Sequence, residues 1–174
     1  MQERFDIVDI NDTVIKTGLL ESELHVNNDI TRVVTIHIQD SEGNYYTAQR
    51  SPNKQIDPLK FEASAHGRVN SGEDYEIAAR REVLEEMGVR DIELQEIAHF
   101  YMSFDSNVGI RQHWKKLYIG KCKKLGKIEK SEIYALKKFE SLEKLLEYFS
   151  ENTEKFSNAV AFDIPYLENF LSSN

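Results

Sequence analysis

Three acidic residues with helical spacing constrain both the fold and the chemistry that this chain can support. Glu82, Glu85 and Glu86 stand at positions i, i+3 and i+4 of one segment. At about 100° per residue their side chains fall within roughly 100° of arc, so we expect their carboxylates to converge on one helix face. Convergent carboxylates repel one another unless a cation lies between them, and oxygen ligands favour Mg²⁺ or Mn²⁺. The spacing therefore predicts a metal site.

The ends of this helix are also marked in the sequence. Ser71, with Asp74 three residues later, resembles a capping box, and Gly88 suits the left-handed position after the last turn. The apolar residues expected on the face away from the acids are Ile77, Val83, Leu84 and Met87. These signals predict a loop followed by a helix between residues 67 and 89.

The same segment matches a family pattern at every fixed position. The matching residues are Gly67, Glu73, Arg81, Glu82, Val83, Glu85, Glu86, Gly88 and Val89. On these residues the chain resembles the Nudix hydrolases, and residues 67–89 resemble the Nudix box. The resemblance implies an α/β/α sandwich with a mixed β-sheet. It also implies hydrolysis of a pyrophosphate linkage in a small nucleoside-diphosphate-type substrate.

The resemblance further implies roles for the residues of the box. Mg²⁺ or Mn²⁺ would be held by Glu82, Glu85 and Glu86, with the backbone carbonyl of Gly67 joining the metal shell. Arg81 would pair with a box carboxylate and orient it. The metal ion would polarise phosphoryl oxygens and lower the pKa of a bound water molecule.

The general base is left open by the sequence. Within the box, Glu85 or Glu86 could serve. Outside it, Glu129 and Glu132 stand where related chains carry a catalytic loop acid before a strand. Glu132, which is nearer to that strand, is the preferred candidate outside the box. A solvated loop acid is the alternative interpretation for either.

Four basic residues near the box are candidates for binding the substrate phosphates. Arg50 ends an expected strand, and Lys54 follows in the loop after it. Arginine can grip a phosphate with two hydrogen bonds, and lysine can act as a point charge. His66 and Arg68 flank the first glycine of the box. Surface solvation is the alternative for Arg50 and Lys54.

Composition excludes several classes of protein. The net charge of −8 over 174 residues disfavours broad binding to nucleic acid, and the seven lysines between residues 115 and 130 read as a solvated strand pair. A single cysteine, Cys122, excludes an intramolecular disulfide and is expected to be structural. The apolar runs are too short to span a membrane, and the start of the chain lacks the apolar core of a signal peptide. We expect a cytoplasmic protein.

The remaining pattern fits a single mixed α/β domain over residues 1–174. Residues 1–30 form an N-terminal extension with a hairpin at 5–10 and 13–18. Further strands are expected at 31–38, 45–50, 92–101 and 110–122, and an extended segment at 61–66. Helical spacing marks 141–151 and 158–171. A homodimer is expected from the family resemblance alone.

Outside the box the chain resembles the branch that includes isopentenyl-diphosphate isomerases and related hydrolases. That isomerase needs a cysteine before the box glycine and a metal-binding histidine after it, where this chain has His66 and Arg68. Its later glutamate pair falls on Gln112 and Trp114. Isomerisation is therefore disfavoured, and a Nudix fold that binds a nucleotide or diphosphate without cleaving it is the other alternative.

Overall fold

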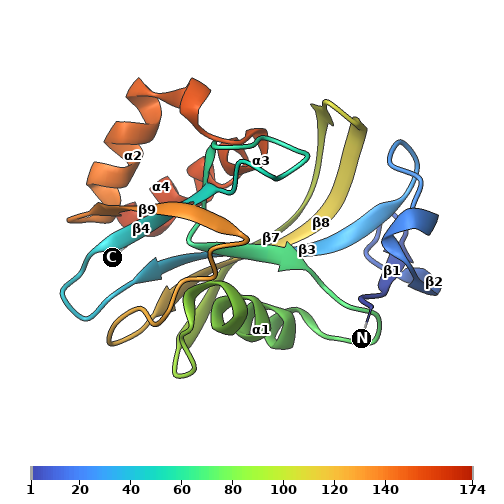
Figure 1. Ribbon diagram of the computed structural model, residues 1–174, viewed down its shortest axis with the longest axis horizontal. Helices are drawn as coiled ribbons and strands as arrows, with labels where there is room; N and C mark the ends of the chain where they lie inside the picture. Colours follow the sequence, from blue (N-terminus) through green and yellow to red (C-terminus); the bar gives the residue numbers. More distant parts are fainter. Residues whose placement is uncertain (1, 174) are drawn as a thin grey trace.

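The computed structural model describes residues 2–173, which form nine strands and four α-helices (Figure 1). The strands are β1 (Phe5–Val8), β2 (Val14–Leu19), β3 (Ile30–Gln39), β4 (Tyr45–Arg50), β5 (Phe61–Glu62), β6 (Ala65–Arg68), β7 (Glu93–Ser106), β8 (Gly109–Lys121) and β9 (Ile133–Phe139). The helices are α1 (Tyr75–Met87), α2 (Leu142–Glu151), α3 (Asn158–Ala161) and α4 (Ile164–Ser172).

Strand β3 is the centre of the sheet. It runs parallel to β8 along its whole length, from Ile30 beside Gln112 to Gln39 beside Lys121. It is antiparallel to β6, β1 and β4, and β7 and β8 form a long antiparallel hairpin. One parallel pair within an otherwise antiparallel sheet makes the sheet mixed, as expected from the sequence.

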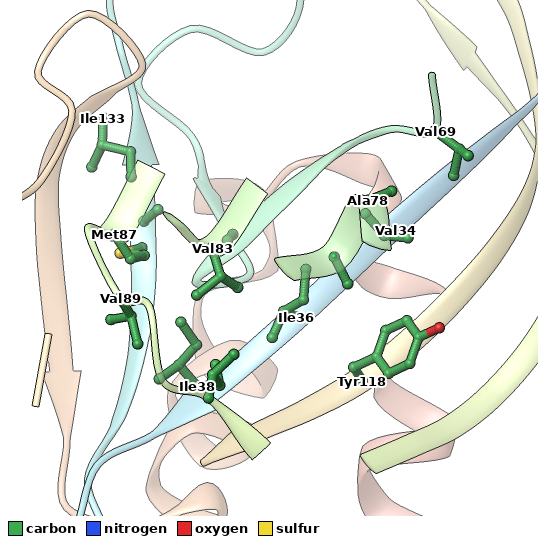
Figure 2. Packing of buried hydrophobic residues seen from close by; sticks show 14 residues of the cluster. Val34, Ile36, Ile38, Val69, Ala78, Val83, Met87, Val89, Tyr118 and Ile133 are labelled. Carbon is green, nitrogen blue, oxygen red and sulfur yellow. The ribbon is translucent and has the colours of Figure 1, made fainter. Parts of the chain in front are cut away.

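Helices cover the two faces of this sheet, α1 on one side and α2 and α4 on the other (Figure 1). Alternate residues of β3 face α1, so Val34, Ile36 and Ile38 are buried together with Val83 and Met87. Figure 2 shows these side chains gathered in one cluster. On the opposite face the core is formed by Tyr45, Ile119, Phe139, Leu142, Leu145 and Leu167. The α/β/α arrangement is the one predicted.

The first turn of α1 differs from the prediction. The N-cap is Asp74, whose carboxylate accepts a hydrogen bond of 2.8 Å from the N–H of Ile77, so the proposed capping box starting at Ser71 was wrong. Gly88 does end the helix in the left-handed conformation, with φ of 63°. Ile77 and Leu84 are exposed rather than buried, because the face turned inward includes Glu82 and Glu86.

Other element boundaries also differ. Strands β7 and β8 extend to a two-residue turn, and the helix expected at 158–171 is divided into α3 and α4. The strand pair expected at 115–130 was wrong, because β8 ends at Lys121 and residues 122–132 form no strand. Strand β9 was absent from the predicted elements. Within residues 2–173, no helix combines the length and apolar character needed to span a membrane.

Candidate active site

Gly67 and Glu82 bring the acidic helix against strand β6. Residues 65 and 67 of β6 face α1, and the carboxylate of Glu82 lies directly against the backbone of Gly67. A Cβ atom at position 67 would stand 1.9 Å from Oε1 of Glu82. Only glycine therefore leaves room for this carboxylate in its present position.

Glu86 is buried next to the same strand. Its side chain accepts a hydrogen bond of 3.1 Å from the backbone N–H of His66. Burial, together with the carboxylates of Glu82 and Glu62, raises the pKa of Glu86 to about 8, although His66 opposes this. Burial also raises the pKa of Glu82, despite the neighbouring Arg81. Two desolvated carboxylates thus lie close to each other.

Arg81 ties the acids of α1 to the loop before the helix. Its guanidinium group donates to both carboxylate oxygens of Glu73, at 3.0 and 2.9 Å, and to the carbonyl of Arg68 at 2.9 Å. It also donates to Glu82 at 2.6 Å and to Glu85 at 3.3 Å. Arg81 therefore fixes the loop, the helix and two of the three acids relative to one another.

Glu85 differs from its two neighbours because its side chain is 55% exposed. Among residues 2–173, no three His, Cys, Asp or Glu side chains are already arranged to hold a metal ion. The convergence expected from the spacing is incomplete because Arg81 holds Glu82 and Glu85 while Glu86 faces His66. The donor set still suits a divalent cation. One such ion would neutralise the two buried carboxylates, which lie beside the backbone of Gly67, a residue without a side chain.

A cavity of about 640 Å³ opens beside these acids. Glu82, Glu85 and Glu86 line it from α1, and His66, Gly67 and Arg68 from β6. The strands β7 and β8 contribute Met102, Phe104, Arg111, His113 and Lys115, and the loops contribute Lys54, Glu129 and Glu132. The structure therefore gathers every one of the predicted site residues except Arg81 around one cavity.

Arg50 and His66 share the carboxylate of Glu62. Arg50 donates to Glu62 at 2.7 Å and to the carbonyl of Ile56 at 2.9 Å, and Nδ1 of His66 lies 3.0 Å from Glu62. Burial alone would raise the pKa of Glu62, but His66 and Arg50 more than offset this and lower it to about 2. Arg50 thus lines the cavity with its guanidinium group already engaged.

Lys54 and Glu132, which both line the cavity, form an ion pair, and each has an intermediate exposure. Glu132 directly precedes β9, in the place that the family resemblance implies. Glu129 donates its backbone N–H to the carbonyl of Glu86 at 3.0 Å, so its loop is attached to the end of α1. Its carboxylate is held by Ser131, which lowers the pKa of Glu129.

Arg68 lines the cavity and is paired with Glu21. The guanidinium–carboxylate distance is 2.7 Å, and the guanidinium group also lies over the ring of Phe5 at 4.9 Å. Its position beside Gly67 is as predicted, and its link to the N-terminal segment could not be read from the sequence.

Three basic residues of β8 were missed by the sequence interpretation. Arg111, His113 and Lys115 alternate along the strand and all line the cavity. His113 is buried with Nδ1 2.9 Å from the hydroxyl of Thr31. Burial lowers its pKa well below the ordinary value, with Arg111 contributing, so the imidazole is neutral. Their alternation places the three on one face of the strand, but only the pairing of β8 with β3 brings that face to the cavity.

The comparisons with known proteins agree with this geometry. The family model described as the NUDIX domain matches residues 29–160, which include α1 and all the predicted site residues. The chain belongs to the Nudix family. A Nudix hydrolase of Deinococcus radiodurans is 37% identical over 87 residues, which are 50% of this chain and 50% of that protein. A Streptomyces coelicolor protein named as an uncharacterized Nudix hydrolase is 30% identical over 67% of this chain and 62% of its own length.

This Nudix chain thus spans about half the length of the first of these curated relatives. Solved structures with the same fold include a crystal structure of a D. radiodurans protein, with a TM-score of 0.75, 24% identity, and coverage of 94% of this chain and 98% of that one. A Methanosarcina mazei MutT protein has a TM-score of 0.65 and 20% identity, and 87% and 99% of the two chains are covered. At these identities the likeness establishes the fold alone.

Proposed function

We propose that this Nudix protein hydrolyses a pyrophosphate linkage in a small nucleoside-diphosphate-type substrate, with Mg²⁺ or Mn²⁺ as cofactor. The observation that carries the proposal is the pair of buried acids Glu82 and Glu86, packed against Gly67 at the wall of a 640 Å³ cavity. Desolvated carboxylates of raised pKa are costly unless a cation neutralises them. A site of this kind serves a metal-dependent reaction at phosphorus.

The metal ion would be held by Glu82, Glu85 and Glu86 and by the carbonyl of Gly67. When bound, it would polarise phosphoryl oxygens and lower the pKa of water. The chain's own contribution is orientation, because Arg81 holds Glu82 and Glu85 in place through four hydrogen-bonding partners. Of Glu82, Glu85 and Glu86, Glu85 is the acid most accessible to a substrate or water molecule.

The general base is assigned to Glu85, Glu86 or Glu132. Glu86 is buried and bonded to the His66 N–H, so it suits metal binding better than proton transfer. Glu132 lines the cavity and can exchange its partner Lys54 for a substrate phosphate, which would free its carboxylate to accept a proton. Comparing the variants Glu132→Gln and Glu85→Gln shows which of these two residues is the general base. The true base gives the larger loss of kcat, and the acid limb of its pH profile disappears.

The substrate phosphates are proposed to bind the cationic side of the cavity. Lys54, His66 and Arg68 line it with partners that are partly exposed or shared, so a phosphate can compete for them. Arg50 contributes mainly by holding Glu62 and His66, since its own donors are engaged. Of the residues predicted to bind the substrate phosphates, Lys54 and Arg68 are therefore better candidates than Arg50.

Hydrolysis is favoured over isomerisation within the isomerase-like branch. Allylic protonation needs a thiol donor and a carboxylate acceptor. This chain has His66 at the position of the thiol, and Gln112 and Trp114 at the positions of the glutamate pair. Cys122 lies outside the cavity lining, and burial raises the pKa of its thiol. All three acids expected to bind the metal ion, Glu82, Glu85 and Glu86, are present.

The test is a release assay for phosphate and pyrophosphate with Mg²⁺ and with Mn²⁺. It would cover nucleoside triphosphates, dinucleotide cofactors, sugar nucleotides and isoprenoid diphosphates. We expect turnover of at least one class, reduced about 100-fold or more in Glu86→Gln and unchanged in Glu147→Gln, an exposed acid of α2. Tight nucleotide binding without turnover under either metal would instead support a non-catalytic binding protein.

A further inference from the structure

A second, smaller cavity continues from the one that holds the acids of α1. Its volume is about 240 Å³. The residues that line both cavities are Glu21, Gln55, Arg68, Arg111 and His113. None of Glu82, Glu85 and Glu86 lines the smaller cavity, so a group bound there lies beyond the diphosphate rather than at it.

Arg111 stands at the junction of the two cavities. Its side chain is half-buried, and it makes no hydrogen bond or ion pair with any residue between 2 and 173. Every other arginine or lysine that lines either cavity has a carboxylate partner within the described chain. These pairs are Arg50 with Glu62, Lys54 with Glu132, Arg68 with Glu21, and Lys115 with Asp163.

A half-buried guanidinium group without a hydrogen-bond acceptor has lost part of its water without replacing it, and the carboxylate that acts on Arg111, Glu21, is itself hydrogen-bonded to Arg68. Arginine carries five N–H donors in a planar fork that matches a phosphate or carboxylate. The carboxylates that line the smaller cavity already have donors, because Glu21 accepts from Arg68 and Asp29 accepts from the backbone N–H of His25. A phosphate group can accept from the N–H donors that Arg111 leaves unused.

We propose that Arg111 binds a phosphomonoester on the part of the substrate remote from the scissile diphosphate, and that the smaller cavity accommodates it. The preferred substrate is therefore a nucleoside diphosphate derivative with one additional phosphate on a sugar. This inference rests on the proposed function for the position of the diphosphate, and it names the substrate class of that site. Arg111 acts as a specificity-determining residue.

The test uses pairs of molecules that share a diphosphate and differ by one phosphomonoester. NADPH against NADH, and coenzyme A against 3′-dephospho-coenzyme A, are such pairs. In the wild type we expect kcat/KM to favour the phosphorylated member of at least one pair by about tenfold or more. Arg111→Gln brings that ratio close to one and leaves kcat/KM for the other member within about threefold. Arg90→Gln, an exposed arginine without an ion pair among residues 2–173, leaves the ratio unchanged.

An equal loss on both members of each pair would overturn the proposal, since Arg111 would then contact the shared diphosphate. A wild-type ratio near one in both pairs would overturn it as well. A binding measurement without metal tests this inference independently of the proposed hydrolysis. By calorimetry without metal, adenosine 3′,5′-bisphosphate should bind more tightly than AMP, and Arg111→Gln should abolish the difference. Equal affinities in the wild type would contradict the proposal even if hydrolysis were observed.

Discussion

Glu86 lies in surroundings that oppose its charge. It is 7% exposed, and Glu82 and Glu62 are near enough to raise its pKa further. Its favourable contacts, the His66 N–H and imidazole, do not compensate for the burial. The adjacent Glu85 is half exposed and paired with Arg81. Two consecutive glutamates of one motif thus have different physical environments.

The pKa of Glu86 makes a prediction about stability without metal. A carboxyl group with a folded pKa of about 8 and an ordinary value of 4.5 holds its proton more tightly in the folded state. Its contribution to stability is therefore full below pH 4.5 and is lost as the pH rises towards 8. In a chelator, Tm should fall between pH 6 and pH 8 by at least about 3 °C more for the wild type than for Glu86→Gln.

The control for that experiment is Mg²⁺. A bound cation stabilises the charged carboxylate, so Mg²⁺ should raise the Tm of the wild type at pH 8 and leave Glu86→Gln nearly unchanged. Identical pH profiles for the two proteins in chelator would show that burial of Glu86 has little electrostatic cost.

Gly67 offers a second prediction at the scale of one residue. Gly67→Ala places a methyl group where the Glu82 carboxylate now lies, so that carboxylate must move. We expect the Mg²⁺ concentration needed for half-maximal activity to rise about tenfold or more, with the fold retained.

A double-mutant cycle isolates this contact. In a Glu82→Ala background the clash is absent, so Gly67→Ala should have little additional effect on metal activation. Fully additive effects would mean that Gly67 acts through the loop backbone rather than through Glu82.

At the scale of elements, a buried ion pair attaches the C-terminal helices to the sheet. Lys115 of β8 donates to Asp163 at 2.5 Å and to the carbonyl of Ala159 at 3.1 Å, and His37 of β3 lies 3.3 Å from Asp163. Asp163 is fully buried at the start of α4. This pair joins α3 and α4 to the two parallel strands.

Asp163→Asn should destabilise the protein strongly. It leaves the Lys115 ammonium group buried without a counter-ion, a change that typically costs about 3–5 kcal/mol of unfolding free energy. Urea denaturation followed by circular dichroism measures this. Glu147→Gln breaks the exposed pair with Lys144 and should cost less than about 1 kcal/mol. A similar small loss for both variants would mean that the buried pair does not secure α4.

The elements that local sequence signals define were predictable, and those defined by tertiary contacts were not. The position of α1 followed from its acids and from Gly88, and β3 and β4 from their alternating residues. The division of the last helix was missed although Pro165 marks it locally, because proline in the first turn of α4 cannot donate the backbone hydrogen bond that would continue α3. The N-cap was assigned three residues too early because both Ser71 and Asp74 are suitable capping residues.

At the scale of the whole molecule, the sandwich places α1 and β8 around one cavity. The acids of α1 come from a motif that a single sequence can reveal, so most of the candidate site was predictable. Arg111, His113 and Lys115 approach it only because β8 pairs in parallel with β3, with Thr31 beside His113 and Val33 beside Lys115. Pairing between strands so distant in the chain is not encoded in local periodicity, which is why these residues were missed.

The central claim is that the acids of α1 form the metal site on which the proposed hydrolysis depends. Mn²⁺ binding to the whole protein, followed by electron paramagnetic resonance of the free ion, tests it most directly. We predict saturable binding in the wild type that weakens at least about tenfold in Glu82→Gln and Glu86→Gln and is unchanged in Glu147→Gln. Equal Mn²⁺ affinity in the wild type and in Glu86→Gln would contradict the account.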